Sequence, residues 1–248
     1  MDNNGMLFLV GTGPGSLEEM TVRAKNILQA CDTVIGYTTY VRLLSPLLTG
    51  KEVLESGMTQ EKERCRLAIE KALQGKKVAL VSSGDSGIYG MSGLVLELME
   101  QDSRSQAISV EMVPGVPAFV AAAAAVGAPL MNDFAAISLS DLLTPWETIE
   151  KRLNAAAQGD FVTCLYNPKS SKRIAQIDRA VEIFSTYRDA HTPCAIVRSV
   201  SRPEQSITMT FLGQLRDCFI DMLCLVIIGN SQTVVTGTWM ITSRGYDL

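Results

Sequence analysis

The chain has 248 residues, of which 47% are hydrophobic, so it is long enough to bury one large core or two smaller ones, and extended disorder is excluded. Its net charge of -4 and its pI of about 5.2 exclude the basic face of a general nucleic-acid-binding protein and favour a small-molecule partner. Six cysteines without a C-x-x-C pair and a single histidine indicate a reducing compartment, the cytoplasm, and argue against a zinc or iron site built by the protein.

The first predicted element is an apolar strand at Met6–Val10, followed by the glycine turn G-T-G-P-G and an amphipathic helix that ends near Ala30. The start of this helix has two candidates. Ser16 with Glu19 forms a capping-box pattern, whereas Thr21 is a suitable N-cap for a later start.

Strand, glycine turn and helix also open the dinucleotide-binding fold, so a nicotinamide-binding oxidoreductase is one alternative function. The dinucleotide fingerprint needs a glycine where this chain has Ser16. It also needs an acidic residue at the end of the second strand, where this chain has Tyr37. The sequence therefore disfavours this alternative.

The fourth strand and its turn form the segment around which the first half is organised. Val78–Val81 is an unbroken apolar run, typical of a strand buried on both faces of a parallel sheet. Serine, glycine and aspartate residues follow at 82–87, at the carboxyl end of the strand, where open α/β sheets bind ligands. The other elements expected in this region are strands at Asp32–Gly36 and Glu52–Leu54 and helices at Thr59–Gln74 and Gly93–Glu100.

The first half ends in a fifth strand, Ile108–Val113, a turn P-G-V-P and an alanine-rich helix, Ala118–Val126. The next residues have the pattern of a linker, so we predict domains at 1–127 and 128–248. This weakly polar region contains too many prolines and glycines to span a bilayer, and the first residues of the chain lack a signal-peptide pattern.

The second half has more strands that follow one another directly, which favours a mixed sheet. Thr144-Pro145-Trp146-Glu147 predicts a helix start, with the threonine as N-cap, the proline at the first helical position and the glutamate closing a capping box. A long helix is expected to end at Tyr187. The predicted strands are Ala135–Leu139, Phe161–Tyr166, Pro193–Val197, Ile207–Leu212 and Met222–Ile228.

Five turns follow predicted strands, in the order G-T-G-P-G, S-G-D-S-G-I-Y-G-M, P-G-V-P-A, L-Y-N-P and G-N-S. In this order they resemble the turns of the tetrapyrrole methylases, which are S-adenosylmethionine-dependent enzymes of corrin and sirohaem synthesis. Three further segments, S-L-S-D-L-L-T-P-W-E, L-Y-N-P-K-S and R-G-Y, are most similar to the precorrin-3B C17-methyltransferase branch and its cobalt-precorrin-3 relatives. The resemblance covers nearly the whole chain.

The resemblance implies an α/β protein of two domains, with a largely parallel sheet in the first, a mixed sheet in the second and the cofactor in the cleft between them. It implies an enzyme that adds a methyl group to carbon 17 of a precorrin-3-type tetrapyrrole, with coupled ring contraction, in cobalamin biosynthesis. A homodimer in the cytoplasm is expected. One alternative within the same fold is methylation of another precorrin carbon, such as carbon 11.

Carried over by position, one set of residues is expected to bind S-adenosylmethionine. Small residues, backbone donors and acceptors and one carboxylate suit a sulfonium with an amino-acid tail better than they suit a phosphate. The aspartate of this set is suited to bond cofactor hydroxyl or ammonium groups, or else to cap its own turn. The set is Pro14, Ser83, Gly84, Asp85, Ile88, Pro117, Ala118 and Tyr166, with Asn167, Gly229 and Asn230 nearby.

Ring contraction moves protons, so a proton donor or base is expected in addition. Tyr37 stands where sirohaem-forming relatives have their catalytic aspartate, so that acid/base pair is not carried over. We nominate Tyr37, Ser86 and Tyr89 for proton handling.

The substrate is a flat ring with many carboxylates and the protein is acidic, so local cations are needed to hold the ring. Trp146 is a further candidate, because its indole is suited to contact a flat ligand. The candidate cations are Arg42, Lys169, Lys172, Arg173, Arg198 and Arg202. Each is otherwise a solvated surface charge.

Overall fold

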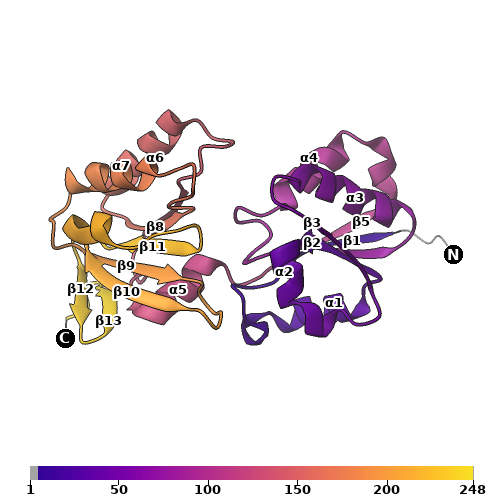
Figure 1. The fold of residues 1–248 in the computed structure, drawn as a ribbon, viewed down its shortest axis with the longest axis horizontal. Coiled ribbons are helices and arrows are strands. Elements are labelled where there is room, and N and C mark those ends of the chain that lie inside the picture. Colours follow the sequence, from indigo (N-terminus) through magenta and orange to yellow (C-terminus); the bar gives the residue numbers. More distant parts are fainter. Residues whose placement is uncertain (1–4, 248) are drawn as a thin grey trace. The chain divides into compact units, whose positions relative to one another are not determined.

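The computed structural model describes residues 5–247 and divides the chain into two compact units, Met1–Ala118 and Phe119–Leu248. Figure 1 labels the helices and strands of each unit. Residues 1–4, on which the signal-peptide expectation rests, and residue 248 belong to the predicted domains but lie outside the described residues.

The division falls between Ala118 and Phe119, whereas the sequence places it after Gly127. The helix α5 (Ala118–Val126) therefore belongs almost entirely to the second unit. Its first turn is fixed there, because the Phe119 ring packs against the Phe134 ring with centroids 5.4 Å apart. Directly after α5, the short strand β6 (Gly127–Ala128) pairs with β13 (Trp239–Thr242) of the same unit.

The first unit has a five-stranded sheet in the order β3-β2-β4-β1-β5, and all of its strand pairs are parallel. The predicted strand with the unbroken apolar run is the central one, and Val78–Val81 are all buried. The strands are β1 (Met6–Gly11), β2 (Thr33–Tyr37), β3 (Glu52–Ser56), β4 (Lys77–Ser82) and β5 (Ser109–Val113).

Helices cover both faces of this sheet (Figure 1). Leu9 and Leu80 point to one side, where they pack with Ile69 of α3 (Glu61–Leu73) and Val95 of α4 (Ser92–Glu100). The alternate strand residues pack on the other side, with α1 (Val22–Ala30) and α2 (Thr38–Leu43). This arrangement confirms the predicted parallel α/β architecture of the first half.

Both predicted starts of the first helical segment are used. The Ser16 hydroxyl accepts a hydrogen bond from the amide of Glu18 and caps a short 3-10 turn, Leu17–Glu19. The Thr21 hydroxyl accepts from the amide of Ala24 and caps α1. The helix α2 was not predicted, because it directly follows β2 and is only six residues long.

The second unit has a five-stranded mixed sheet in the order β10-β9-β11-β8-β7, which confirms the predicted mixed sheet. Strand β7 runs parallel to β8, whereas β11 runs antiparallel to both β8 and β9. Because β8 and β9 are both antiparallel to β11, they run in the same direction. The strands are β7 (Phe134–Ser138), β8 (Val162–Tyr166), β9 (Pro193–Arg198), β10 (Ser206–Phe211) and β11 (Cys224–Ile228).

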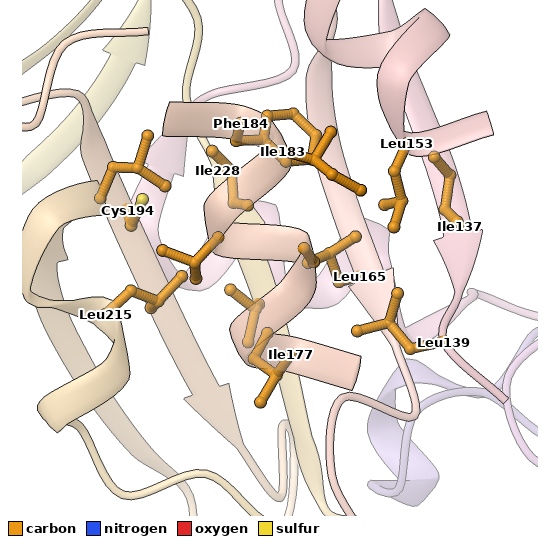
Figure 2. Close-up of a cluster of buried hydrophobic side chains, with 14 of the residues drawn as sticks. Ile137, Leu139, Leu153, Leu165, Ile177, Ile183, Phe184, Cys194, Leu215 and Ile228 are labelled. Atoms are coloured by element: carbon orange, nitrogen blue, oxygen red, sulfur yellow. The ribbon is translucent and has the colours of Figure 1, made fainter. Parts of the chain in front are cut away.

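Two helices, α6 (Trp146–Gln158) and α7 (Ala175–Ser185), pack on one face of the mixed sheet. Figure 2 shows the core between these helices and the sheet, where Phe184, Leu153 and Leu165 lie fully buried. Truncating such a side chain to alanine typically costs about 2–5 kcal/mol, so this core fixes the positions of the loops that follow the strands.

The start of α6 differs from the prediction. Pro145 occupies the N-cap position and Trp146 is the first helical residue, and the helix start has no side-chain capping bond. The capping box expected from Thr144 and Glu147 is therefore wrong. The carbonyl of Pro145 instead accepts hydrogen bonds from the amides of Thr148 and Ile149.

A small sheet in the order β12-β13-β6, with β12 at Thr233–Thr236, was not predicted, because its strands are two to four residues long. Residues 5–247 contain no helix that is both long and apolar enough to cross a membrane.

Candidate functional site

Two glycine turns of the first unit meet at the carboxyl edge of its sheet. The amide of Gly13, after β1, donates to the carbonyl of Gly84, after β4, over 3.1 Å, and the amide of Gly84 donates back to the carbonyl of Gly13 over 2.7 Å. Gly84 has a φ of +67°, a left-handed conformation that favours glycine. The two predicted motifs are thus joined by a reciprocal pair of backbone bonds.

A third turn, after β5, packs against the first two so closely that side chains are excluded. A Cβ added to Gly115 would lie 2.1 Å from the carbonyl oxygen of Gly84, and one added to Gly11 would lie 2.6 Å from the amide nitrogen of Gly115. Neither position has room for alanine. The ends of β1, β4 and β5 therefore form one contiguous backbone surface, which we call the glycine edge (residues 11–15, 83–91 and 114–118).

The carboxylate of Asp85 ties the glycine edge together. Its Oδ1 accepts from the amide of Gly87 over 2.8 Å, and its Oδ2 accepts from the amide of Gly115 over 3.0 Å. The capping role considered from the sequence is therefore present. Two of the roughly four lone-pair positions of a carboxylate are used in this way, so the others remain for a ligand.

The other predicted cofactor residues of the first unit lie in the same segments. Pro14 is buried, and Ser83, Pro117 and Ala118 are half-buried. Ile88 is exposed over 38% of its surface, so its side chain is accessible from the glycine edge.

The three nominated proton-handling residues have different environments. The Ser86 hydroxyl is buried and donates to the carbonyl of Leu9 over 3.1 Å, so its proton is engaged within the fold. Tyr89 has a φ of +53° and is 56% exposed. Tyr37 is half-buried at the end of β2, with its ring edge-on to Tyr40 at 5.1 Å between centroids.

The second unit has its own carboxyl edge, formed by the parallel strands β7, β8 and β9. The Tyr166 hydroxyl, at the end of β8, accepts from the amide of Phe119 over 3.1 Å. The next residue, Asn167, has a φ of +50°, and its side-chain amide donates to the hydroxyl of Ser138, at the end of β7, over 2.9 Å. Leu165 and Ile196 both lie opposite Val226, so the end of β9 reaches the same edge.

Gly229 and Asn230, which together with Asn167 were expected near the cofactor pocket, do not lie at the same edge as Asn167. The strand before them, β11, is antiparallel to β8, and its last residue, Ile228, pairs with Thr163. Gly229 is therefore about 16 Å from Asn167 along the strand direction. Asn230 is buried at this opposite edge, where its side-chain amide donates to the carbonyl of Asp160 over 3.1 Å.

Two of the predicted substrate-binding cations already have partners within the fold. Arg173 is buried and donates from Nε and Nη2 to the carbonyl of Asn167, at 3.2 and 3.0 Å. Arg198 donates from Nε to the carboxylate of Asp221 over 2.9 Å. Both arginines therefore hold the second carboxyl edge in place.

The remaining predicted substrate contacts differ in how exposed they are. Arg42 and Lys172 are exposed, whereas Lys169 and Arg202 are half-buried. The Nε of Arg202 is buried without a hydrogen-bond partner among the described residues. Trp146 packs against the core under α6, which accounts for its presence without a ligand.

One residue that the sequence did not single out lies at the first carboxyl edge. Arg64 of α3 is 4% exposed and contacts residues at the ends of β2 and β3 and after β4. Its position in a helix with many charged residues gave no signal, because a buried arginine and a solvated one look alike in a helical pattern.

The composition of the glycine edge fits a cationic ligand with hydroxyl and amino-acid groups. Its three segments contain no lysine or arginine and one carboxylate, Asp85. A phosphate would need cations or a row of free amides. S-adenosylmethionine needs acceptors, backbone groups and close approach, which glycines and one carboxylate provide. The residues present therefore fit this cofactor.

Residues 5–247 include no group of three or more histidine, cysteine or acidic side chains placed to hold a metal ion. Burial raises the pKa of the Cys65, Cys164 and Cys194 thiols to about 12, so these cysteines are protonated core residues at neutral pH.

Comparisons with known proteins show what the chain as a whole is similar to. A family model described as Tetrapyrrole (Corrin/Porphyrin) Methylases matches residues 6–216. The chain is 48% identical over 243 residues to the "Probable cobalt-factor III C(17)-methyltransferase" of Salmonella typhimurium, covering 98% of this chain and 100% of that protein. It is 46% identical over 244 residues to the "Cobalt-factor III methyltransferase" of Priestia megaterium, covering 98% of this chain but 45% of that protein. The solved structure of the methyltransferase CobJ superposes with a TM-score of 0.90 at 36% identity, covering 96% of this chain and 100% of that chain.

Proposed function

The chain belongs to the tetrapyrrole methylases, and on this premise we propose that it transfers a methyl group from S-adenosylmethionine to carbon 17 of a precorrin-3-type tetrapyrrole, with coupled ring contraction, in cobalamin biosynthesis. The observation that carries the proposal is the similarity of nearly the whole chain to the Salmonella protein named for this reaction. Similarity of this extent argues against the nicotinamide-binding alternative.

The proposed ring carries cobalt. Two relatives, 48% and 46% identical to this chain, are both named for cobalt-factor III. In this proposal the cobalt is part of the substrate and needs no ligands from the protein.

We assign cofactor binding in the first unit to the glycine edge. The free lone pairs of Asp85 would accept from hydroxyl or ammonium groups, and the side chains of Pro14, Ile88 and Pro117 would contact apolar parts of the cofactor. From the second unit, Tyr166 and Asn167 are the proposed contacts. Gly229 and Asn230 lie at the opposite edge of their sheet from Asn167, so we leave them out of the proposed set.

S-adenosylmethionine supplies a methyl group already activated as a sulfonium, so the protein has to align the ring carbon more than to add acid or base. Ring contraction needs proton movement, for which Tyr37 and Tyr89 are the proposed residues. The Ser86 proton is engaged with Leu9, so we expect this hydroxyl to hold the loop.

Lys169, Lys172, Arg202 and Arg42 are the proposed contacts for the acetate and propionate groups of the ring. Ion pairs with such groups give orientation more than affinity when they are exposed. We also propose a homodimer in the cytoplasm, for which the resemblance of the chain to its family is the support; analytical ultracentrifugation tests the dimer.

The direct test incubates the protein with methyl-labelled S-adenosylmethionine and either the cobalt-containing or the metal-free ring. The expected result is one label per ring, at carbon 17 by NMR of the product, with the cobalt ring preferred. Label at carbon 11 would replace the proposed activity with the alternative. Absence of label with both rings, in protein that binds S-adenosylhomocysteine, would contradict the proposal.

A further inference from the structure

The guanidinium of Arg64 is buried with only neutral hydrogen-bond partners. It donates from Nε to the Ser56 hydroxyl over 2.8 Å, from Nη2 to the Gly57 carbonyl over 2.7 Å and from Nη1 to the Met91 sulfur over 3.5 Å. A guanidinium has five N–H donors, so two are left over. The thioether is a weak acceptor, so the Nη1 side of the group is poorly satisfied.

This positive charge has no anionic partner among residues 5–247. No carboxylate lies within 4.0 Å of Arg64, although nine other basic side chains of the described chain, eight of them lysine or arginine, form such pairs. The acidic residues of the same helical turn, Glu61 and Glu63, are exposed. A charge that is 4% exposed and unpaired is costly.

The helix makes the position of this charge less favourable still. Arg64 is the fourth residue of α3, which begins at Glu61, so it lies in the first turn. The N-terminal end of a helix carries a partial positive charge and attracts anions. A buried cation at this end is unfavourable twice over, and an anion placed beside it would be favourable for both reasons.

The surroundings of Arg64 connect it to the proposed active site. Its Cζ lies 6.0 Å from the centroid of the Tyr37 ring, at the end of β2, and Ser56 is the last residue of β3. Met91 directly follows residues 87–90, four exposed residues of the glycine edge. The guanidinium therefore lies at the carboxyl edge of the parallel sheet, next to a loop that a ligand can reach.

We propose that Arg64 is a carboxylate-binding residue, and that a carboxylate of the bound ligands replaces the Met91 thioether as the acceptor from Nη1. The inference rests on the proposed function, which supplies two sources of carboxylate, the side groups of the tetrapyrrole and the amino-acid part of the cofactor. A flexible methionine is suited to cover the site, since its thioether moves aside at little cost.

The test compares the Arg64→Met variant with a matched control, Arg66→Met, in which an exposed arginine of the same helix is changed. S-adenosylhomocysteine affinity is measured by calorimetry and tetrapyrrole affinity by quenching of uroporphyrin III fluorescence. Loss of a charge-assisted bond predicts that Arg64→Met weakens one of these ligands about ten-fold or more. The ligand that is weakened identifies the source of the carboxylate.

Stability gives a second readout. Arg64→Met removes an unpaired buried charge and also two hydrogen bonds, to Ser56 and Gly57, so the informative quantity is the change in melting temperature that a ligand causes. The ligand that Arg64 holds is expected to raise the melting temperature of the parent more than that of Arg64→Met. If Arg64→Met fails to fold, Arg64→Lys is used in its place, because lysine keeps the positive charge but lacks the planar guanidinium group. Arg64→Lys is expected to weaken one of the two ligands at least three-fold.

The inference is overturned if both affinities of the folded Arg64 variant stay within two-fold of those of Arg66→Met. This outcome differs from a failure of the proposed function. If the parent protein binds both ligands and Arg64→Met weakens one, but labelled S-adenosylmethionine gives no methylated carbon 17, the carboxylate site stands and the assigned reaction falls.

Discussion

The carboxyl edges of the two sheets are built by different means. In the first unit, Gly13, Gly84 and Gly115 bring three backbone segments into contact, with one carboxylate between them. In the second unit, Arg173 and Asn167 shape the edge through side-chain bonds to backbone and hydroxyl groups. A backbone contact excludes every Cβ, whereas a side-chain bond is lost one partner at a time, so the two edges should respond differently to substitution.

The largest expected effect comes from Gly115→Ala. The new Cβ would lie 2.1 Å from the carbonyl oxygen of Gly84, so the turns must separate. Overpacking of this kind costs about 1–3 kcal/mol or more. We expect a clear fall in melting temperature by calorimetry and loss of S-adenosylhomocysteine binding.

Two further glycine variants make this result specific. Gly229→Ala also creates a clash, 2.7 Å from Cβ of Thr233, and should lower stability while leaving the affinity of the folded protein for S-adenosylhomocysteine unchanged. Gly93→Ala meets no atom within 4 Å and lies in a helix, so it should stabilise by up to about 1 kcal/mol. Equal loss of affinity in Gly115→Ala and Gly229→Ala would show that the two edges of the structure are not functionally distinct.

The next effect tests the side-chain-built edge. Arg173→Met removes two bonds to the carbonyl of Asn167, a residue already in a left-handed conformation. Loss of hydrogen bonds to a charged group costs about 1.5–3 kcal/mol. The free energy of unfolding in urea is expected to fall by this amount, while the exposed neighbour variant Lys172→Met changes it by less than about 0.5 kcal/mol. Similar values for the two variants would mean that Arg173 does not hold Asn167.

A smaller effect is expected for Asp85→Asn at the glycine edge. An amide has one oxygen, so either Gly87 or Gly115 would face an NH₂ group in place of an acceptor. We expect a loss of about 1–2 kcal/mol and faster hydrogen exchange at one of these two amides. Glu55→Gln, an exposed change in the same unit, is the control. Unchanged exchange at both amides would exclude Asp85 as the link between the turns.

The same contrast explains which parts of the site were predictable. The strands of the first unit are parallel, so residues that follow different strands meet at one edge, and the resemblance had assigned Pro14, Gly84 and Pro117, one from each turn, to the same predicted pocket. In the second unit the apolar run of β11 identified a strand but not its direction. Its antiparallel direction moved Gly229 and Asn230 to the opposite edge.

The sequence also did not show which arginine side chains are buried. Arg173 and Arg198 were expected to face the substrate, yet their nearest partners are the Asn167 carbonyl and the Asp221 carboxylate. Arg64 was not nominated, although it is more deeply buried than either. A charged residue has no periodic pattern of its own, so only the packed structure shows which arginines are enclosed.

The smallest expected effect is at the amino-terminal edge of the first sheet. Side-chain bonds hold this edge together, as they do at the carboxyl edge of the second sheet. The Glu52 carboxylate accepts from Lys71, from Lys76 Nζ over 2.8 Å and from the Thr33 hydroxyl over 2.8 Å. These bonds lower the pKa of Glu52 from 4.5 to about 2. The folded state therefore binds this proton less readily than the unfolded state.

The stability of the protein is expected to depend on pH through Glu52. The stabilisation by Glu52 is complete above its unfolded pKa and is lost as the pH falls from about 4.5 towards 2. The free energy of unfolding, measured in urea across this pH range, should therefore fall less steeply with decreasing pH in Glu52→Gln than in the parent. Glu55→Gln should fall as steeply as the parent. Because the network is partly exposed, added salt should reduce the difference. If the free energy of unfolding falls equally with pH in the parent and in Glu52→Gln, the lysines at this edge are solvated and do not stabilise the fold through Glu52. The first unit would then depend on backbone contacts at both edges of its sheet.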